Sequence, residues 1–475
     1  MSSRSIPDKK RIPKTCLSDA VYGFPDACAL GMAFHSGEAD PVDIARRCLA
    51  EAEKAGTVYL CVTAARALAE AEDSRRRYQD KTPYSLFDGV PVNWKDTFDV
   101  AGTVTTSGSA VFENDPPVKT DGPLSDAATQ AGMVCLGKVN TCEFAYSSVG
   151  VNRHFGSPIN PWSTADAPRT CGGSSSGSAA SVAAGLIPVS IGSDAGGSIR
   201  VPASFTGICG FKPTSGRYAP GGMKALARTL DSPGPMTRSV RDLIVMDAIL
   251  RGEMPGTVPV APALPGLRFV VDASLLEDAL ITDGVRRVFE EAVRRLIESG
   301  ADVDYRTVQS FHDARKSMAN GWIIGAEVFT ELKPLLDNPE TAASMDQRIR
   351  RRAEQSRNMP PNVVVQSYWD RRRLTEAMRD DLQGAVLILP SVAYSAPLLH
   401  PLKVDDEAFA ASVQNNPRLT AAGNFMNMPA VALPVGLDEN GMPIGASLYH
   451  AAGEDQALLA AALAAESSLS GHTSR

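Results

Sequence analysis

Hydrophobic residues recur along the chain with two different periods, which together predict both strands and helices. Short apolar runs typical of buried strands lie at residues 58–62, 133–136, 186–191, 267–271, 386–390 and 431–435. Apolar positions at helical spacing lie between them, at residues 41–52, 63–78, 125–131, 283–299 and 457–467, and across much of the charge-rich segment 308–380. Because strands and helices alternate, we expect an α/β fold with helices on the faces of a sheet.

One segment is built almost entirely from Gly, Ser and Ala. Residues 172–185 contain no other residue type except Val182, and they lead directly into the apolar run at 186–191. A flexible linker could have this composition, but the adjoining strand favours a loop followed by a tightly packed helix of small residues. Since no break in composition divides the chain, we expect a single domain over 31–475, preceded by an N-terminal tail or arm at 1–30.

Composition and charge narrow the class of protein. With 475 residues and 44% hydrophobic content, the chain can bury a large core. The formal net charge is −7, so Lys and Arg provide no surplus to neutralise phosphates, and we expect no nucleic-acid partner. No apolar stretch has the length of a membrane span or follows the basic N-terminus as in a signal peptide. The expected location is therefore cytoplasmic, without membrane attachment. The eight cysteines show no CxxC spacing and predict reduced thiols rather than a zinc site.

The first candidate for chemistry is Lys95, which follows the apolar segment Val90–Trp94 and precedes Asp96. Most lysines are solvated surface charges. A lysine at the end of a buried strand must find a partner or lose its proton, because burial disfavours the charged ammonium. Lys95 is therefore either an ordinary surface residue or a lysine with an unusual pKa.

Two loops combine consecutive glycines with serine, at residues 172–178 and 192–200. Without a Cβ, glycine lets backbone N–H groups converge on a small anion, such as the oxyanion of acyl transfer. A flexible turn or a phosphate site would also suit such sequences. A phosphate-binding P-loop requires Lys soon after the last glycine, whereas Ile199 and Arg200 follow here.

A Ser-His-Asp hydrolase is a further alternative, because Gly173–Gly177 formally matches GxSxG with Ser175 at its centre. That motif requires an apolar strand immediately before it, and residues 163–170 form none. None of the six histidines lies in a pattern that marks a general base. The sequence therefore disfavours this arrangement.

Taken together, Lys95 after a strand and the two glycine-serine loops resemble the amidase signature family. Ser174 and Ser198 lie 24 positions apart, which fits the spacing in that family. The resemblance covers about residues 35–467, with further matching segments at 154–156, 160–162, 207–214, 231–240, 427–430, 434–436 and 441–445. It implies the amidase signature fold, with a mixed central β-sheet sandwiched between α-helices. It also implies a signature core at about 88–240 and a variable substrate-pocket region at about 310–370.

The resemblance also implies roles for individual residues. Ser198 matches the nucleophile, Ser174 the relay serine that follows a cis peptide bond, and Lys95 the base. On chemistry alone, Ser175 and Ser176 would serve as well as Ser174. The remaining implied site residues are the backbone N–H groups of Ala195, Gly196, Gly197 and Ser198 as oxyanion hole, and Gly172, Gly173 and Asp194 as loop support. Cys171 and Ala195 depart from the family pattern, which has Pro and Thr or Ile there. No metal and no cofactor is implied.

The activity implied is hydrolysis of the C–N bond of a small-molecule amide through a serine acyl-enzyme. Carbamates, ureas and esters are alternative substrates for the same chemistry. Another alternative is the glutaminase subunit of a tRNA-dependent amidotransferase, and a third is a non-catalytic binding protein that keeps the scaffold. The expected partner is a small amide or carbamate, and the sequence leaves a homodimer open.

Overall fold

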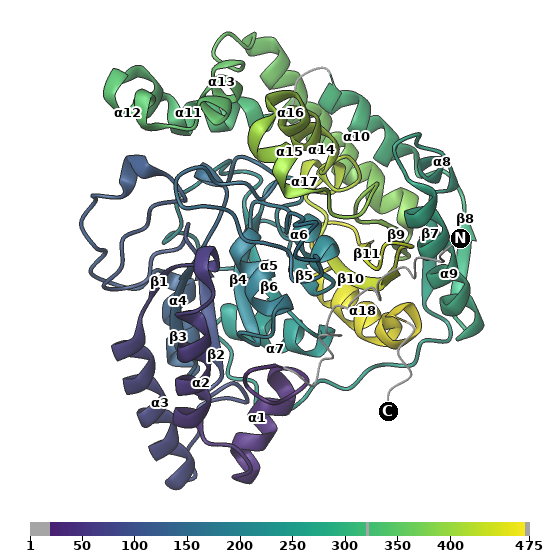
Figure 1. Cartoon of the computed structure of the whole chain (residues 1–475). Coiled ribbons are helices and arrows are strands. Elements are labelled where there is room, and N and C mark those ends of the chain that lie inside the picture. Colours follow the sequence, from purple (N-terminus) through teal and green to yellow (C-terminus); the bar gives the residue numbers. More distant parts are fainter. Residues whose placement is uncertain (1–19, 320–322, 471–475) are drawn as a thin grey trace, which may run out of the picture.

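The computed structural model describes residues 20–319 and 323–470 of the chain (Figure 1). Most of the predicted tail and three residues of the predicted pocket region lie outside the described residues. The structure contains a sheet of eleven strands in the order β1-β3-β2-β4-β6-β5-β10-β11-β9-β7-β8. These strands are β1 Tyr59–Val62, β2 Pro91–Lys95, β3 Val134–Val139, β4 Val189–Asp194, β5 Cys209–Lys212, β6 Ser232–Thr237, β7 Arg268–Val271, β8 Asp302–Tyr305, β9 Val386–Pro390, β10 Ala430–Leu437 and β11 Pro443–Tyr449.

Helices cover the sheet, and Figure 1 shows α1–α3 and α11–α16 at opposite ends of the view. In chain order the helices are α1 Ala27–Ser36, α2 Pro41–Ala52, α3 Ala64–Gln79, α4 Pro123–Gln130, α5 Ser176–Ala183, α6 Arg200–Thr206, α7 Val240–Leu250, α8 Ala273–Leu276, α9 Asp283–Glu298, α10 Gln309–Ala319, α11 Ile323–Asp337, α12 Pro339–Ser344, α13 Gln347–Glu354, α14 Pro361–Leu382, α15 Leu399–Val404, α16 Asp406–Asn415, α17 Ala421–Phe425 and α18 Asp455–Ser470.

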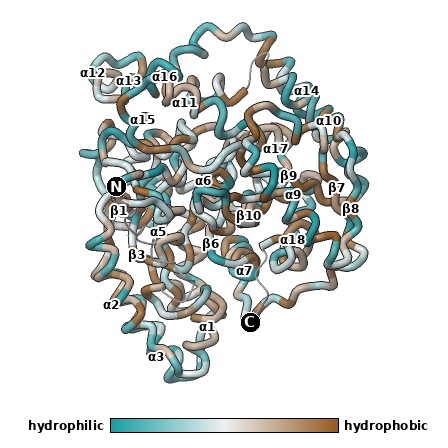
Figure 2. The backbone as a smooth tube through the Cα atoms, turned by 45° about the vertical axis from the view of Figure 1, so that its right-hand side comes forward, coloured by the Kyte–Doolittle hydropathy of each residue, from teal (hydrophilic) through white to brown (hydrophobic). Residues whose placement is uncertain are grey.

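Strand β9 shows how both faces of the sheet are buried. Successive side chains of a strand point to opposite faces. Leu387 and Leu389 pack in a cluster with residues of α10 and α14, whereas Ile388 packs with residues of α9 and α18. In Figure 2 the outer helices alternate between hydrophilic and hydrophobic colouring, as expected when one side of a helix rests on a sheet. The predicted α/β fold, a mixed sheet between helices, is confirmed.

The sheet is mixed, and its parallel part positions the candidate site. Strand β2 pairs in parallel with both β3 and β4, and β7 pairs in parallel with β8 and β9, while the other pairings are antiparallel. Lys95 is the last residue of β2 and Asp194 the last residue of β4. Because β2 and β4 are parallel neighbours, the loops that follow them leave the same edge of the sheet.

Most of the elements predicted from hydrophobic periodicity are present. Residues 386–390 form β9, and the segment of small residues forms a loop followed by helix α5. The run predicted at 186–191 is shifted, because β4 spans Val189–Asp194. Helix α1 begins at Ala27, inside the span assigned to the tail, and Asp242 of α7 accepts hydrogen bonds from the backbone N–H groups of Ala27 and Cys28.

Strand β6 was not predicted from the sequence, because it contains Pro233 and Pro235. Proline lacks the N–H group that a strand donates to its neighbour and normally argues against a central strand. Alternate residues of an antiparallel strand face the same neighbour, so both prolines remove donors from one edge of β6 and leave the other intact.

Within the described residues, no helix is both long enough and apolar enough to cross a membrane.

Gly177 tests the packing of α5 against the loop that follows β3. A Cβ at this position would lie 2.4 Å from the backbone N of Asn140 and 2.9 Å from the backbone O of Val58. Since backbone atoms cannot move aside cheaply, we expect Gly177→Ala to lower the free energy of unfolding by about 1–3 kcal/mol. Thermal denaturation measures the loss.

The matched control is Gly256→Ala, because an added Cβ there meets nothing within 4 Å. We expect the melting temperature of this variant to equal that of the wild type. Equal stability of the two variants would contradict tight packing of α5.

Candidate active site

Lys95, Ser174 and Ser198 come from three separate segments that meet at the carboxyl edge of β2 and β4. Lys95 ends β2, Ser174 lies in the loop before α5, and Ser198 lies in the loop between β4 and α6. The backbone N–H of Ser175 donates to the carbonyl of Ser198 at 3.2 Å, which joins the two serine loops directly. Lys95 and Ser174 are fully buried, whereas Ser198 keeps 8% of its surface accessible. Of the three residues, Ser198 is therefore the one that solvent reaches.

The Lys95 ammonium group contacts two serine side chains. Its Nζ lies 2.6 Å from Oγ of Ser174 and 2.8 Å from Oγ of Ser193. The other serines of the first loop point elsewhere, and Oγ of Ser175 donates to the carbonyl of Ser193 at 3.2 Å. From the sequence alone, Ser174, Ser175 and Ser176 were equally suitable partners for Lys95. The structure shows Ser174 in contact with Lys95.

No carboxylate forms an ion pair with Lys95 within the described residues. Asp96 is next in sequence, but its carboxylate binds Nζ of Lys138 at 2.8 Å instead. Burial lowers the pKa of Lys95 to about 8, and the negative charges of Asp231 and Asp194 only partly oppose that shift. A minor fraction of Lys95, roughly one tenth at pH 7, is therefore neutral and able to accept a proton.

The peptide bond between Gly173 and Ser174 is cis, as the family resemblance implies. The carbonyl of Ser174 accepts hydrogen bonds from the backbone N–H of Cys142 at 3.2 Å and from Oγ1 of Thr141 at 3.0 Å. A Cβ on Gly173 would lie 2.6 Å from Sγ of Cys142. The absence of a side chain at Gly173 therefore lets the Ser174 loop pack directly against residues 141–142.

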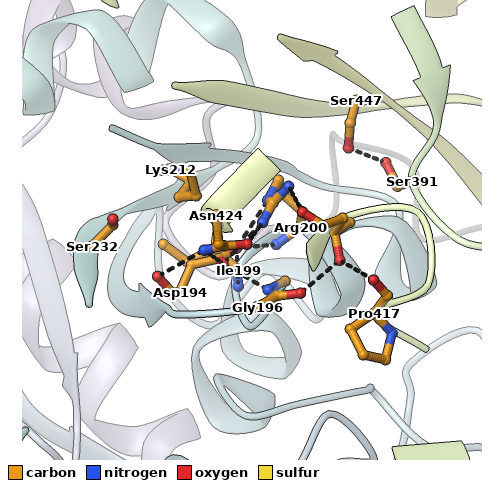
Figure 3. Close-up of polar contacts among 12 residues, drawn as sticks. Asp194, Gly196, Ile199, Arg200, Lys212, Ser232, Ser391, Pro417, Asn424 and Ser447 are labelled. Carbon is orange, nitrogen blue, oxygen red and sulfur yellow. Dashed lines mark hydrogen bonds and ion pairs between the residues drawn. The ribbon is translucent and has the colours of Figure 1, made fainter. Parts of the chain in front are cut away.

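The loop that carries Ser198 is organised by Asp194. Its carboxylate accepts hydrogen bonds from the backbone N–H groups of Gly197 at 2.7 Å and Ile199 at 3.1 Å. It also accepts from Nε of Arg200 at 3.0 Å and from Nδ2 of Asn424 at 2.8 Å (Figure 3). Burial would raise the pKa of Asp194, but the Arg200 guanidinium holds it well below its usual range. Asp194 therefore stays ionised and holds the backbone of the Ser198 loop in place.

The backbone amides of this loop divide into two groups. The N–H of Gly197 is taken by Asp194, whereas no hydrogen bond among residues 20–319 and 323–470 uses the N–H groups of Ala195, Gly196 or Ser198. The carbonyl of Gly196 accepts from Oγ1 of Thr420 at 2.8 Å, which fixes the orientation of the following peptide. Donors therefore remain available beside Ser198.

Ala195 joins the site to a buried apolar cluster. It packs in one buried cluster with Phe144, Tyr146, Leu226 and Ile323. Ile323 belongs to α11, inside the segment 310–370 to which the resemblance assigns the pocket.

In the part of the chain that is described, no three His, Cys, Asp or Glu side chains gather in a way that could hold a metal ion.

Several residues of the site escaped sequence reasoning. Ser193 belongs to the second glycine-serine segment and, in the structure, to β4; its Oγ reaches Nζ of Lys95 because β2 and β4 pair, which the sequence alone does not indicate. Thr420 and Asn424 come from a segment more than 220 positions further along the chain. No local pattern marks these two positions, because they act through tertiary contact.

The buried pair of Asp194 and Arg200 generates a stability prediction. Asp194→Ala would leave the Arg200 guanidinium buried without its counter-charge. We expect the free energy of unfolding to fall by about 3–5 kcal/mol, measured by chemical denaturation. The control is Asp73→Ala, which removes an exposed partner of Arg76 and should cost at most about 1 kcal/mol. Similar losses for both variants would argue against a structural role for Asp194.

Comparison with known proteins identifies the family of the chain. The Amidase family model matches residues 43–459. A glutamyl-tRNA(Gln) amidotransferase subunit from Acinetobacter baylyi is 31% identical over 426 residues, covering 82% of this chain and 84% of that protein. Mandelamide hydrolase of Pseudomonas putida is 30% identical over 445 residues, covering 86% and 84%. A solved amidase crystal structure has a TM-score of 0.82 at 26% identity, covering 94% of this chain and 100% of that chain. The chain therefore belongs to the amidase signature family of hydrolases, which act on C–N bonds of non-peptide amides.

Proposed function

We propose that this enzyme hydrolyses a small-molecule amide through an acyl-enzyme on Ser198, with Ser174 as proton relay and Lys95 as base. The observation that carries the proposal is the contact of 2.6 Å between Nζ of Lys95 and Oγ of Ser174, in a site where Lys95 is fully buried. A serine hydroxyl is a weak nucleophile until a base takes its proton. A neutral lysine in hydrogen-bond contact with a serine is such a base.

The first half-reaction begins at Ser198. Lys95 accepts the proton of Ser174, and Ser174 accepts the proton of Ser198 as Oγ of Ser198 attacks the amide carbon. The carbonyl oxygen becomes an oxyanion, for which the N–H groups of Ala195, Gly196 and Ser198 are the available donors. A single donor of this kind typically contributes about 2.7–4 kcal/mol to transition-state stabilisation. Gly197 contributes indirectly, since its N–H ties the loop to Asp194.

Collapse of the tetrahedral intermediate breaks the C–N bond. The leaving nitrogen receives the proton through Ser174 and departs as ammonia or an amine. Water then gives its proton to Ser174 and Lys95 by the same route, attacks the acyl-enzyme and releases the acid. Protons balance in both half-reactions. Lys95 returns its proton to the leaving nitrogen in the first and to Oγ of Ser198 in the second.

A second candidate function is the glutaminase step of an amidotransferase. Its support is the amidotransferase subunit from Acinetobacter baylyi, which matches this chain at 31% identity, about as well as mandelamide hydrolase does. In that case the amide is that of glutamine and the released ammonia passes to a partner protein. Carbamates and esters remain alternative substrates, because Ser198 would attack their carbonyl carbon in the same way.

Ser198→Ala tests the nucleophile. We expect it to lower kcat by about 10⁴-fold or more, because no other hydroxyl takes its place. The assay measures product release from primary amides, anilides, carbamates, esters and glutamine. Ammonia from glutamine alone would favour the glutaminase function, and hydrolysis of simple amides would favour the free-standing enzyme.

The control for that experiment is Ser344→Ala, which removes an exposed hydroxyl bound to the carbonyl of Glu340. It should leave every rate unchanged. Covalent labelling by a fluorophosphonate should occur in wild type and in this control but not in Ser198→Ala. Normal turnover by Ser198→Ala would overturn the proposed mechanism.

The pH dependence of kcat/KM tests Lys95. The neutral form is the base and its pKa is about 8, so the rate should rise about tenfold per pH unit below 8 and level off above. Lys95→Met, which removes the amine, should lower kcat about 10²–10⁴-fold and abolish this rise. A rate that falls with increasing pH in wild type would mean that the charged form is the active one.

A further inference from the structure

A groove beside the site carries an excess of positive charge. Its volume is about 910 Å³, within the range of small-molecule sites. Residues of α10, α13, α16 and α17 line it, together with the segment 417–418. Its described lining has one carboxylate, Asp406, and an apolar part formed by Met318, Phe409 and Val413. The cations that line it are Arg315, Lys316, Arg348, Arg351, Arg352 and Arg418.

The groove is attached to both catalytic loops. Pro417 lines the groove, and its carbonyl accepts from Oγ1 of Thr420, the same atom that donates to the carbonyl of Gly196. Figure 3 shows Pro417 and Gly196 on adjacent segments. On the other side, the carbonyl of Val413 accepts from Oγ of Ser148, whose own carbonyl accepts from the N–H of Gly173. A single residue, Thr420, therefore bridges the groove and the Ser198 loop, and a single residue, Ser148, bridges the groove and the Ser174 loop.

The positive charges of the groove are not fully balanced. The ion pairs join Arg315 and Arg418 to Asp278, Lys316 to Asp313, Arg348 to Asp346, and Arg351 to Asp406. Asp278 thus serves two arginines, and Arg352 has no carboxylate partner among the described residues. Six lining cations face four carboxylates, which leaves the groove attractive to an anion.

Arg352 is positioned to bind that anion. Its guanidinium lies 3.9 Å above the ring of Tyr146, and Nη1 donates to the Tyr146 carbonyl at 2.6 Å. No described residue accepts a hydrogen bond from its Nε or Nη2, the two donors that bind a carboxylate side by side. Tyr146 in turn packs in the apolar cluster that contains Ala195 of the Ser198 loop. The half-buried guanidinium is therefore held in place with its carboxylate-binding edge unused.

We propose that the groove binds a carboxylate of the substrate, with Arg352 as its main ligand, so that the enzyme acts on amides that carry a free carboxylate. This rests on the proposed amide hydrolysis at Ser198. The apolar part of the groove, around Phe409, fits the carbon chain between the carboxylate and the amide. A specificity of this kind raises the affinity for acidic substrates and leaves the chemistry at Ser198 unchanged.

Binding is tested in the Ser198→Ala protein, where no turnover intervenes. The probe is adipate, the dicarboxylate product of its own monoamide, titrated by calorimetry. We expect Arg352→Gln to weaken adipate binding about tenfold or more, Arg352→Lys to restore part of the loss, and Arg372→Gln to change nothing. Arg372 is a matched control, since its side chain is 86% exposed on α14. Equal affinity in all four proteins would overturn the proposal.

Kinetics with matched substrates complete the test. Adipic acid monoamide and hexanamide share a six-carbon chain and differ in the terminal carboxylate. In the protein with Ser198 intact, the monoamide should have a kcat/KM about tenfold or more above that of hexanamide. Arg352→Gln should remove this preference by raising KM for the monoamide, with kcat and the hexanamide rate unchanged.

The outcomes separate the two proposals. Equal hydrolysis of both amides by the wild type would overturn the carboxylate site and leave the proposed function standing. Loss of both activities in Arg352→Gln, with a lowered melting temperature, would make Arg352 a structural residue and also overturn it. Absence of turnover together with absence of fluorophosphonate labelling would refute the proposed function, and adipate binding would then decide the groove by itself.

Discussion

The ion pair between Asp194 and Arg200 is the constraint on which the conformation of the Ser198 loop depends. Both side chains are fully buried, and burying two charges is costly unless every donor and acceptor is satisfied. Here Asp194 accepts from two backbone amides of its own loop, while Arg200 donates to the carbonyl of Thr420 and to the hydroxyl of Tyr449. A loop path that moved Asp194 away from Arg200 would leave both buried charges unpaired. The position of Ser198 is therefore set by the satisfaction of these charges.

A second consequence of burial concerns two lysines on neighbouring strands of the sheet. Lys95 and Lys138 lie on the neighbouring strands β2 and β3, and both are buried. Asp96 binds Lys138, whose Nζ also donates to Oγ1 of Thr105 at 3.0 Å. Among the described residues, Lys95 contacts the hydroxyls of Ser174 and Ser193 and the carbonyl of Ser193, which stabilise its charge far less than a carboxylate does. Burial lowers the pKa of both lysines, but a carboxylate binds Lys138 and none binds Lys95 among the described residues.

That distinction marks the limit of what the sequence could predict. Hydrophobic periodicity located most strands and helices, because each depends on local spacing, and two short motifs located Ser174 and Ser198. The choice of Lys138 over Lys95 as the partner of Asp96 depends on strand pairing, which no local pattern encodes. Strand β6 was missed for a related reason, since the neighbours of Pro233 decide whether its missing donor matters. Tertiary pairing, more than local propensity, was the missing information.

The segment 413–424 contacts both the groove and the loop that carries Ser198. It forms one wall of the groove through Val413 and Pro417, and it also supplies Thr420 and Asn424 to the loop of Ser198. Substitutions in this segment would disturb the groove and the backbone N–H groups beside Ser198 together, so they could not separate the proposed specificity from the proposed catalysis. Arg352 lies on α13 and reaches the site only through the Tyr146 ring and carbonyl. Arg352 is therefore the position at which the proposed recognition of a carboxylate can be tested without a substitution in the loops of Ser174 and Ser198.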